Sequence, residues 1–355
     1  MDENNETLST VDPFDEPLEP QLSDRLILND TYFAAARGAI TVDGMAYSFL
    51  KPPYMNFDDQ MRAKRKLKEA YTQREFLLLY GYSGCGKTTI LSQFAEKYSN
   101  YIFLLKDFDS YSPAQMLVEM GECLHMPIKL RRNELHTLKR HIEALQGVMF
   151  LFDEVTAGTN ASFQKLEMLR RIHDETHVPI VICGVPLLHK TIYSSSRFDY
   201  YCSLISRMDE HEMHGMRRTD AGSYIEMVAK AENVRFSYPA QQALITTALN
   251  RGIGGINAFT TVIGRCITLA RVHYYNSPGH SIPDKTKCIR TEIPGDNAYP
   301  GAKLILTLPA TPEPVQITEQ MVSDMQNEYK SHFPRMVNTK KIILPENTDP
   351  ISEEE

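Results

Sequence analysis

The stretch from Phe76 to Ile90, FLLLYGYSGCGKTTI, constrains the fold of this chain more than any other. Its four leading apolar residues are typical of a strand that is buried on both faces of a parallel sheet. A glycine-rich turn follows, and Lys-Thr-Thr then opens a helical pattern. Strand, glycine-rich turn and helix in this order predict a phosphate-binding loop in an α/β fold.

Gly81 to Thr88 fits the loop pattern G-x-x-x-x-G-K-[ST]. The glycines allow successive backbone N–H groups to face one concavity, and the following helix adds the positive end of its dipole. Lys87 is spaced to reach the β- and γ-phosphates of a nucleoside triphosphate, and the Thr88 hydroxyl to bind Mg²⁺. The residues expected to line the nucleotide are Gly81, Tyr82, Ser83, Gly84, Cys85, Gly86, Lys87, Thr88 and Thr89.

A second motif, VMFLFDEV, runs from Val148 to Val155. Four apolar residues followed by Asp-Glu are typical of a strand that ends in one acid that binds Mg²⁺ and a second acid that activates water. Asp153 is expected to hold Mg²⁺, and Glu154 to polarise the attacking water. The alternative is an ordinary strand that ends in two acids.

Two further apolar runs, 101–105 and 180–183, alternate with helical patterns. This alternation predicts a parallel sheet with right-handed crossovers, flanked by helices, with the nucleotide at the carboxyl edge. Three more helices are expected at 219–233, 239–250 and 257–275, where they would form a small lid.

The expected organisation has six parts, in chain order. They are a disordered acidic arm (1–24), an N-terminal attachment with a hairpin around Asp43-Gly44 (25–54), the nucleotide-binding core (55–217), the helical lid (218–276), a C-terminal extension with a strand at 303–308 and a helix at 318–332 (277–340), and an acidic tail (341–355).

Charge is unevenly distributed between these parts. The chain has a net charge of −7, but residues 1–24 hold eight acids and no Lys or Arg, and residues 341–355 hold five acids and one lysine. The part between the two acidic ends is therefore mildly basic. A helix expected from about residue 58 to 72 is rich in Lys and Arg, which indicates either a solvated face or a contact to nucleic-acid phosphates.

Several classes of protein are disfavoured. The acidic N-terminus is unlike a signal peptide and no apolar run is long enough to span a bilayer, so we expect a cytoplasmic protein without a membrane partner. The six cysteines form no C-x-x-C pair, which favours reduced thiols. His173 and His177 stand four apart but lack the E-x-x-H frame of a zinc hydrolase.

Taken together, these motifs resemble an AAA+ ATPase module over residues 55–276. Within that superfamily the chain most resembles the regulators of DNA transposition, the group of TnsC, TniB, MuB and IstB proteins. The resemblance is carried by FLLLYGYSGCGKTT, VMFLFDEV, IVICGVP, SLISRMDEHEM and GIGGINAFTTVIGRCITLA. It implies ATP with Mg²⁺ as the cofactors and slow, assembly-dependent hydrolysis as the activity.

The resemblance also assigns roles to individual residues. Lys87 and Glu154 would be catalytic, and Arg207 would be an arginine finger that reaches the nucleotide of a neighbouring subunit; the alternative for Arg207 is a surface ion pair. Two positions depart from the group's pattern. Gly184-Val185 stands where a small polar sensor is usual, and Asn257 stands where an arginine commonly follows the lid glycines. Asn257 is expected to contact a phosphate of the nucleotide by a hydrogen bond, without a charge to neutralise it. These departures are the reason to expect slow turnover.

The implied partners are double-stranded DNA, a transposase and target-selection proteins, bound by a homo-oligomeric ring or filament. The candidate DNA contacts are Lys106, Lys129, Arg131 and Arg132, each of which is also an ordinary exposed base. Two other functions stay open: an AAA+ or STAND-like switch that acts through protein partners without DNA, and a nucleotide-binding scaffold with negligible hydrolysis.

Overall fold

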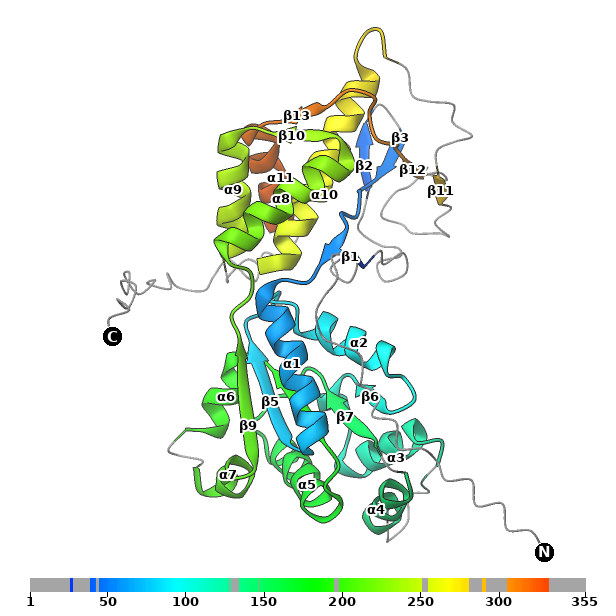
Figure 1. Ribbon diagram of the computed structural model, residues 1–355, viewed down its shortest axis with the longest axis vertical. Helices are drawn as coiled ribbons and strands as arrows, with labels where there is room; N and C mark the ends of the chain where they lie inside the picture. The colour runs from blue at the N-terminus through cyan, green and yellow to red at the C-terminus, as the bar shows by residue number, and fades with distance from the viewer. Residues whose placement is uncertain are drawn as a thin grey trace, which may run out of the picture.

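The computed structural model has an α/β body below and a helical body above (Figure 1). The residues that it describes are 26–27, 39–42, 45–126, 128, 134–145, 147–194, 198–250, 255–280, 289–291 and 305–331. Among them, no helix has the length and apolar character that crossing a bilayer requires.

A five-stranded parallel sheet forms the centre of the lower body. Its strands, in spatial order, are β6 (Ile102–Leu105), β7 (Met149–Phe152), β8 (Ile180–Gly184), β5 (Phe76–Gly81) and β9 (Met208–Met213). All six residues of β5 are buried, as its unbroken apolar run predicts. The expected parallel α/β fold is therefore confirmed.

Alternate side chains of these strands pack against helices on opposite faces of the sheet. On one face Leu77, Leu79 and Val181 lie in a core with α1 (Asp58–Gln73) and α2 (Lys87–Lys97). The opposite face is covered by α3 (Pro113–Cys123), α4 (Glu134–Ala144), α5 (Asn160–Thr176), α6 (Pro186–Ile192) and α7 (Phe198–Ile205), with the short 3₁₀ turn η2 (Phe108–Ser110) nearby. Helices thus shield both faces of the sheet from water, which explains why the strands are almost continuously hydrophobic.

The upper body is the lid, and its core is separate from the two cores of the sheet. Its helices are α8 (Arg218–Glu232), α9 (Tyr238–Leu249), α10 (Gly255–Asn276) and α11 (Glu319–Ser331), and its strands β10 (Val234–Phe236) and β13 (Val315–Ile317) pair in parallel. Arg271, which is 3% exposed, pairs with Glu232 at 2.7 Å and donates to the carbonyl of Leu308 at 3.1 Å. The helix expected at 318–332 is confirmed as α11, and it packs against α9 and α10.

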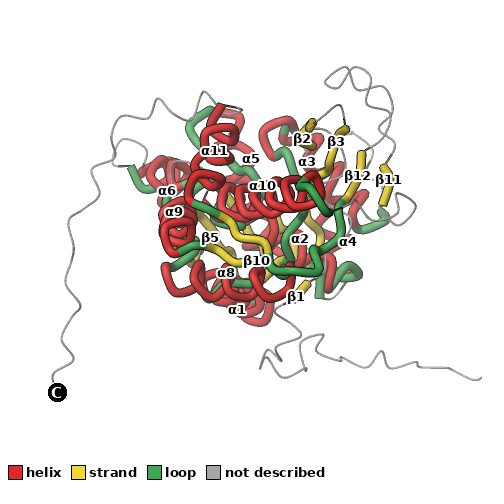
Figure 2. Tube along the Cα trace, turned by 90° about the horizontal axis from the view of Figure 1, so that it is seen from above, coloured by secondary structure: helices red, strands yellow, loops and turns green. Residues whose placement is uncertain are grey.

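Segments from both ends of the chain meet beside the lid. The antiparallel pairing of β2 (Ala39–Val42) with β3 (Met45–Ser48) confirms the expected hairpin, whereas its turn residues, Asp43 and Gly44, lie outside the described residues. With β11 (Ile289–Thr291) and β12 (Ile305–Thr307) it forms a four-stranded sheet in the order β11-β12-β3-β2, and Figure 2 shows these strands side by side. A separate two-residue strand, β1 (Leu26–Ile27), pairs with β4 (Tyr54–Met55) directly before α1.

Several sequence expectations lie outside the described residues. These are the acidic arm, the acidic tail, and the candidate DNA contacts Lys129, Arg131 and Arg132. The boundaries of the six expected parts stay a prediction.

Candidate nucleotide site

The glycine-rich loop joins the carboxyl end of β5 to the first turn of α2. Gly84 and Gly86 have positive φ angles, +81° and +96°, which an L side chain rarely adopts. At Gly86 a Cβ would also lie 2.1 Å from Nε2 of Gln60, and at Gly81 it would lie 2.4 Å from the carbonyl oxygen of Met213. Glycine is therefore required here both by backbone conformation and by close packing.

Lys87 is the first residue of α2, and its ammonium group lies back over the loop. Nζ donates to the carbonyl oxygens of Gly81 at 2.8 Å and Tyr82 at 2.9 Å. The Lys87 ammonium and the N-terminal end of the α2 dipole therefore both favour an anion at the loop. Thr88 is exposed at the next position, and Thr89 is half-buried.

Asp153 lies just beyond β7, at the same edge of the sheet as the loop. It is 2% exposed, and its Oδ1 accepts a hydrogen bond from the N–H of Glu154 at 2.9 Å. A carboxylate buried this deeply needs a cation or further donors. Oxygen ligands of this kind, together with the Thr88 hydroxyl, suit Mg²⁺.

Glu154 has a φ of +56°, which is uncommon for a residue other than glycine. The backbone on both sides fixes this conformation, because Asp153 N donates to Leu105 O at 2.9 Å and Val155 N donates to Cys183 O at 2.8 Å. Glu154 itself is exposed at the sheet edge. Strained backbone of this kind is concentrated at functional sites.

Cys183 is the polar neighbour of Asp153 that sequence reasoning missed. It ends the apolar run of β8 on the same face as Leu79 and Val181, and it is fully buried. Burial raises the pKa of its thiol well above the usual range, and the nearby Asp153 charge acts in the same direction, whereas Lys87 opposes it. Asp153, Lys87 and Cys85 therefore all lie around one buried thiol, although Asp153 and Lys87 come from motifs far apart in the sequence.

The lid contacts the phosphate-binding loop directly. The N–H of Ile256, in the first turn of α10, donates to the carbonyl of Gly84 at 3.0 Å. Asn257, the residue expected to contact phosphate from the lid, is the next residue of this turn and is exposed. Its own contact to a phosphate stays a prediction.

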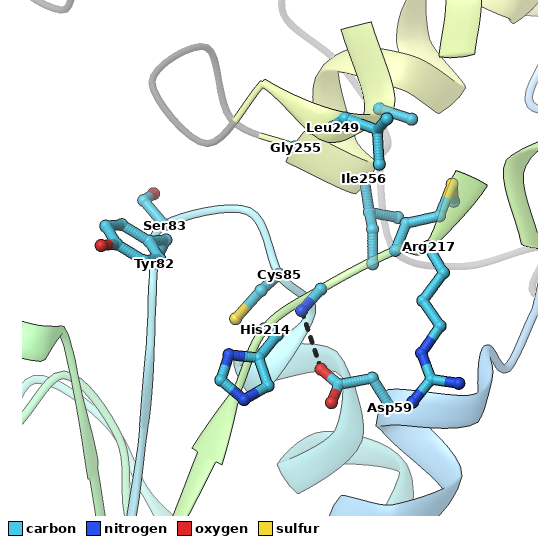
Figure 3. A pocket seen from close by; sticks show the side chains of 12 residues that line it. Asp59, Tyr82, Ser83, Cys85, His214, Arg217, Leu249, Gly255 and Ile256 are labelled. Atoms are coloured by element: carbon cyan, nitrogen blue, oxygen red, sulfur yellow. Dashed lines mark hydrogen bonds between the residues drawn. The ribbon is translucent and has the colours of Figure 1, made fainter. Parts of the chain in front are cut away.

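A cavity of about 200 Å³ lies between the loop, the lid and the start of α1 (Figure 3). Its polar lining includes Asp59, His214 and Arg217, and its apolar lining includes Met216, Leu249 and Ile256. Asp59 accepts a hydrogen bond from the N–H of Gly215 at 2.8 Å, which ties α1 to the connector between β9 and the lid. Sequence reasoning missed these residues because no motif marks them and folding alone brings them together.

Arg207 does not join this site within the chain. It directly precedes β9, whose first residue Met208 pairs with Phe76, whereas Gly81 pairs with the last residue of β9. It is therefore about 17 Å from the loop, at the opposite edge of the sheet. Its Nε donates to Asp174 at 2.7 Å, and its side chain is 42% exposed.

Of the four candidate DNA contacts, Lys106 is described. It is exposed directly after β6, at the carboxyl edge of the sheet that also carries Asp153. The described residues contain no group of three or more His, Cys, Asp or Glu side chains that could hold a metal ion.

A family model and solved structures are similar to this chain. Residues 70–192 match the family model of the AAA domain. No curated protein matches the sequence. Cdc6p from Pyrobaculum aerophilum is similar in structure with a TM-score of 0.47 at 14% identity, over 60% of this chain and 62% of that one. A Drosophila ORC structure bound to DNA gives a TM-score of 0.35 at 9% identity, over 44% of this chain and 90% of that one.

The matched residues include the loop, the buried Asp153 and four strands of the sheet, β5 to β8. Such domains bind nucleotides and in general hydrolyse them. Residues 70–192 are therefore similar to an AAA domain, and the parallel sheet with its glycine-rich loop has the fold of an AAA+ P-loop module.

Proposed function

We propose that this chain binds ATP with Mg²⁺ at the glycine-rich loop and hydrolyses it slowly. One observation carries the proposal: the Lys87 ammonium, the buried Asp153 carboxylate and the strained Glu154 all lie at one edge of the sheet. Loop N–H groups and Lys87 would bind the phosphates, and Thr88 and Asp153 would hold Mg²⁺, which neutralises phosphate charge when bound. Glu154 would orient the attacking water and accept its proton.

The cavity beside the loop supports a site for the base and ribose of the nucleotide. Its apolar lid residues can pack against a flat ring, while Asp59, His214 and Arg217 offer hydrogen-bonding groups. Because α10 also contacts Gly84, a bound nucleotide would touch both bodies of the molecule at once. We therefore expect nucleotide binding to tie the lid to the sheet.

Thermal unfolding with and without ligand tests this function. Mg²⁺-ATP at about 100 times its Kd stabilises a folded protein by about 2.7 kcal/mol, so the melting temperature of the intact chain should rise. Lys87→Ala should abolish this rise, whereas Lys190→Ala, which removes an exposed lysine on α6, should preserve it. Equal stabilisation of the wild type and the Lys87 variant would refute the assignment of the loop.

The finer proposal is an assembly-dependent regulator of DNA transposition. It is supported by the resemblance of the motifs to that group and by the mildly basic body between the acidic ends. The position of Arg207, far from its own loop, favours a role at a neighbour's nucleotide. Target DNA, a transposase and target-selection proteins would be the partners, with Lys106, Lys129, Arg131 and Arg132 as the DNA contacts.

Negative-stain microscopy on duplex DNA with an ATP analogue, ADP or no nucleotide tests this finer proposal. Rings or filaments that form on DNA with the ATP analogue alone would support it. Monomers under every condition, with ATP still bound, would favour a switch that acts through protein partners. The eight acids of residues 1–24 favour that second function, because DNA would repel them.

A further inference from the structure

A buried lysine that the proposed hydrolysis does not use lies near the carboxyl edge of the sheet. Lys165, in the second turn of α5, is 2% exposed. Its Nζ donates to the carbonyl oxygen of Phe108 at 2.6 Å and lies 4.2 Å from the centre of the Phe108 ring. Burial lowers the pKa of this amine, and the charge of Asp109 acts in the opposite direction. A buried ammonium is costly unless acceptors surround it, so these contacts fix Lys165 against the turn η2.

The turn η2 connects this lysine to the segment that follows β7. Asp109, the middle residue of η2, has one carboxylate oxygen 3.9 Å from Nζ of Lys165. Its other carboxylate oxygen accepts a hydrogen bond from the hydroxyl of Thr156 at 2.7 Å. Asp109 and Thr156 are 47 positions apart in the sequence, and they meet because β6 and β7, which precede them, are neighbours in the sheet (Figure 1). Asp109 therefore bridges the buried lysine and Thr156.

Thr156 lies two residues after Glu154, the acid that has a φ of +56°. A residue other than glycine keeps this conformation only where the surrounding structure over-determines it. Backbone hydrogen bonds already hold Asp153 to β6 and Val155 to β8. The hydrogen bond from Thr156 to Asp109 adds a third attachment, which holds the chain after Glu154 to a different element, η2.

We propose that Lys165, Asp109 and Thr156 are positioning residues, which hold Glu154 in the conformation from which it meets the attacking water. The inference rests on the proposed function, because it assumes that Glu154 acts on this water. Lys165 fixes η2, and η2 places the Asp109 carboxylate where it binds Thr156. Each of the three residues acts through Glu154, so a change at any of them should alter the rate of hydrolysis and not the affinity for the nucleotide.

Single-turnover hydrolysis by the intact chain, together with binding of a fluorescent ATP analogue, tests the inference. Thr156→Val removes the hydroxyl and keeps the volume of the side chain, at an exposed position where folding should not suffer. The hydrolysis rate should fall about tenfold, because small displacements of a reacting group are costly, while the affinity for the analogue should stay within about twofold. Thr156→Ser retains the hydroxyl and should hydrolyse ATP at a rate close to that of the wild type.

The matched control is Thr246→Val, at an exposed position of α9 where the hydroxyl donates to the carbonyl of Gln242 in the same helix at 2.8 Å. This variant should leave both the rate and the affinity unchanged. Lys165→Met removes the buried charge at similar volume and should lower the rate in the same direction as Thr156→Val. Circular dichroism establishes first that Lys165→Met is folded, and a folded variant with the wild-type rate would overturn the role of Lys165. Should it fail to fold, the exposed Thr156 variants decide the inference.

A double variant separates a positioning role from a general effect on the fold. If Thr156 acts through Glu154, then Thr156→Val should lower the rate no further once Glu154→Gln is present. Independent effects of the two changes would overturn the inference, as would a wild-type rate in Thr156→Val or an equal loss of rate and affinity. Failure of the proposed function gives a different result, because Glu154→Gln alone would then hydrolyse ATP at the wild-type rate.

Discussion

At the scale of single residues, the candidate site contains a glutamate that is held in an unusual conformation. Glu154 has a φ of +56°, and backbone hydrogen bonds on both sides fix it beside the buried Asp153. In this left-handed conformation the side chain of Glu154 leaves the backbone in a different direction from the side chains of the preceding strand β7. The backbone thus separates two adjacent acids, one buried against the sheet and one exposed at its edge.

Replacing Glu154 by Gln should separate hydrolysis from binding. Glutamine keeps the size of the side chain but cannot accept a proton, so the hydrolysis rate should fall by about 10²- to 10⁴-fold while nucleotide affinity stays near that of the wild type. Single-turnover hydrolysis and binding of a fluorescent ATP analogue measure the two quantities. Glu226→Gln, on the exposed face of α8, is the control. A parallel loss of affinity would instead mean that Glu154 positions the nucleotide.

The sequence predicted the residues of this site unequally. Lys87, Thr88, Asp153 and Glu154 were predictable because each stands at a fixed spacing within a local motif. Cys183 was not predictable, because within an apolar run it resembles any other buried residue. Only the pairing of β7 with β8 places it beside Asp153. Asp59 and His214 were missed because their proximity arises from the tertiary fold alone.

At the scale of elements, the lid helix α10 packs closely against the N-terminal segment. Gly264 in its middle packs directly on the chain that follows β3, where a Cβ would lie 2.0 Å from the carbonyl of Leu50. On the same stretch, the N–H of Leu50 donates to Thr268 Oγ1 at 2.8 Å. The helix and the N-terminal segment are therefore held together by backbone contact.

Gly264→Ala should lower the free energy of unfolding by about 1–3 kcal/mol, because the new methyl group forces this backbone apart. Gly222→Ala is the matched control in α8, since a Cβ there would meet nothing within 4 Å. That variant should raise the free energy of unfolding by about 0.8–1 kcal/mol through helix propensity. Urea titration of both variants measures these changes, and equal stability of the two would contradict the packing argument.

The long elements were predictable and the short ones were not. Strands such as β5 and helices such as α10 carry an apolar pattern long enough to be recognised, and both lie where it predicts them. The three residues of β13 contain no such pattern, and nothing local indicates that they pair with β10. For the same reason the sequence placed α11 in a separate extension, whereas its buried face completes the core of the lid.

At the scale of the whole molecule, the position of Arg207 bears on the proposed assembly-dependent hydrolysis. Within the chain this arginine pairs with Asp174, at the sheet edge opposite to the loop. Such an exposed pair contributes at most about 1 kcal/mol, so it can be exchanged for a phosphate of a neighbouring subunit at little cost. The proposed assembly would supply that neighbour.

Mixing two inactive variants tests this dependence. Arg207→Ala lacks the proposed finger and Glu154→Gln lacks the proposed catalytic base, so each alone should hydrolyse ATP poorly. In mixed assemblies an intact site can meet an intact finger, and random pairing should restore roughly a quarter of the wild-type rate. The mixed ATPase rate is measured against each variant alone at the same total concentration. No recovery, with assembly intact, would exclude a finger in trans.

The pairing of the two ends of the chain also sets the order in which the molecule can be completed during its synthesis. Ser48 in β3 and Thr307 in β12 bond at 2.6 Å although they are 259 positions apart. At a translation rate of about 5–20 residues per second, the hairpin waits about 10 to 50 s for its partner strand. The large sheet, whose strands lie between residues 76 and 213, can form during this wait, while the edge of β3 stays open to other growing chains.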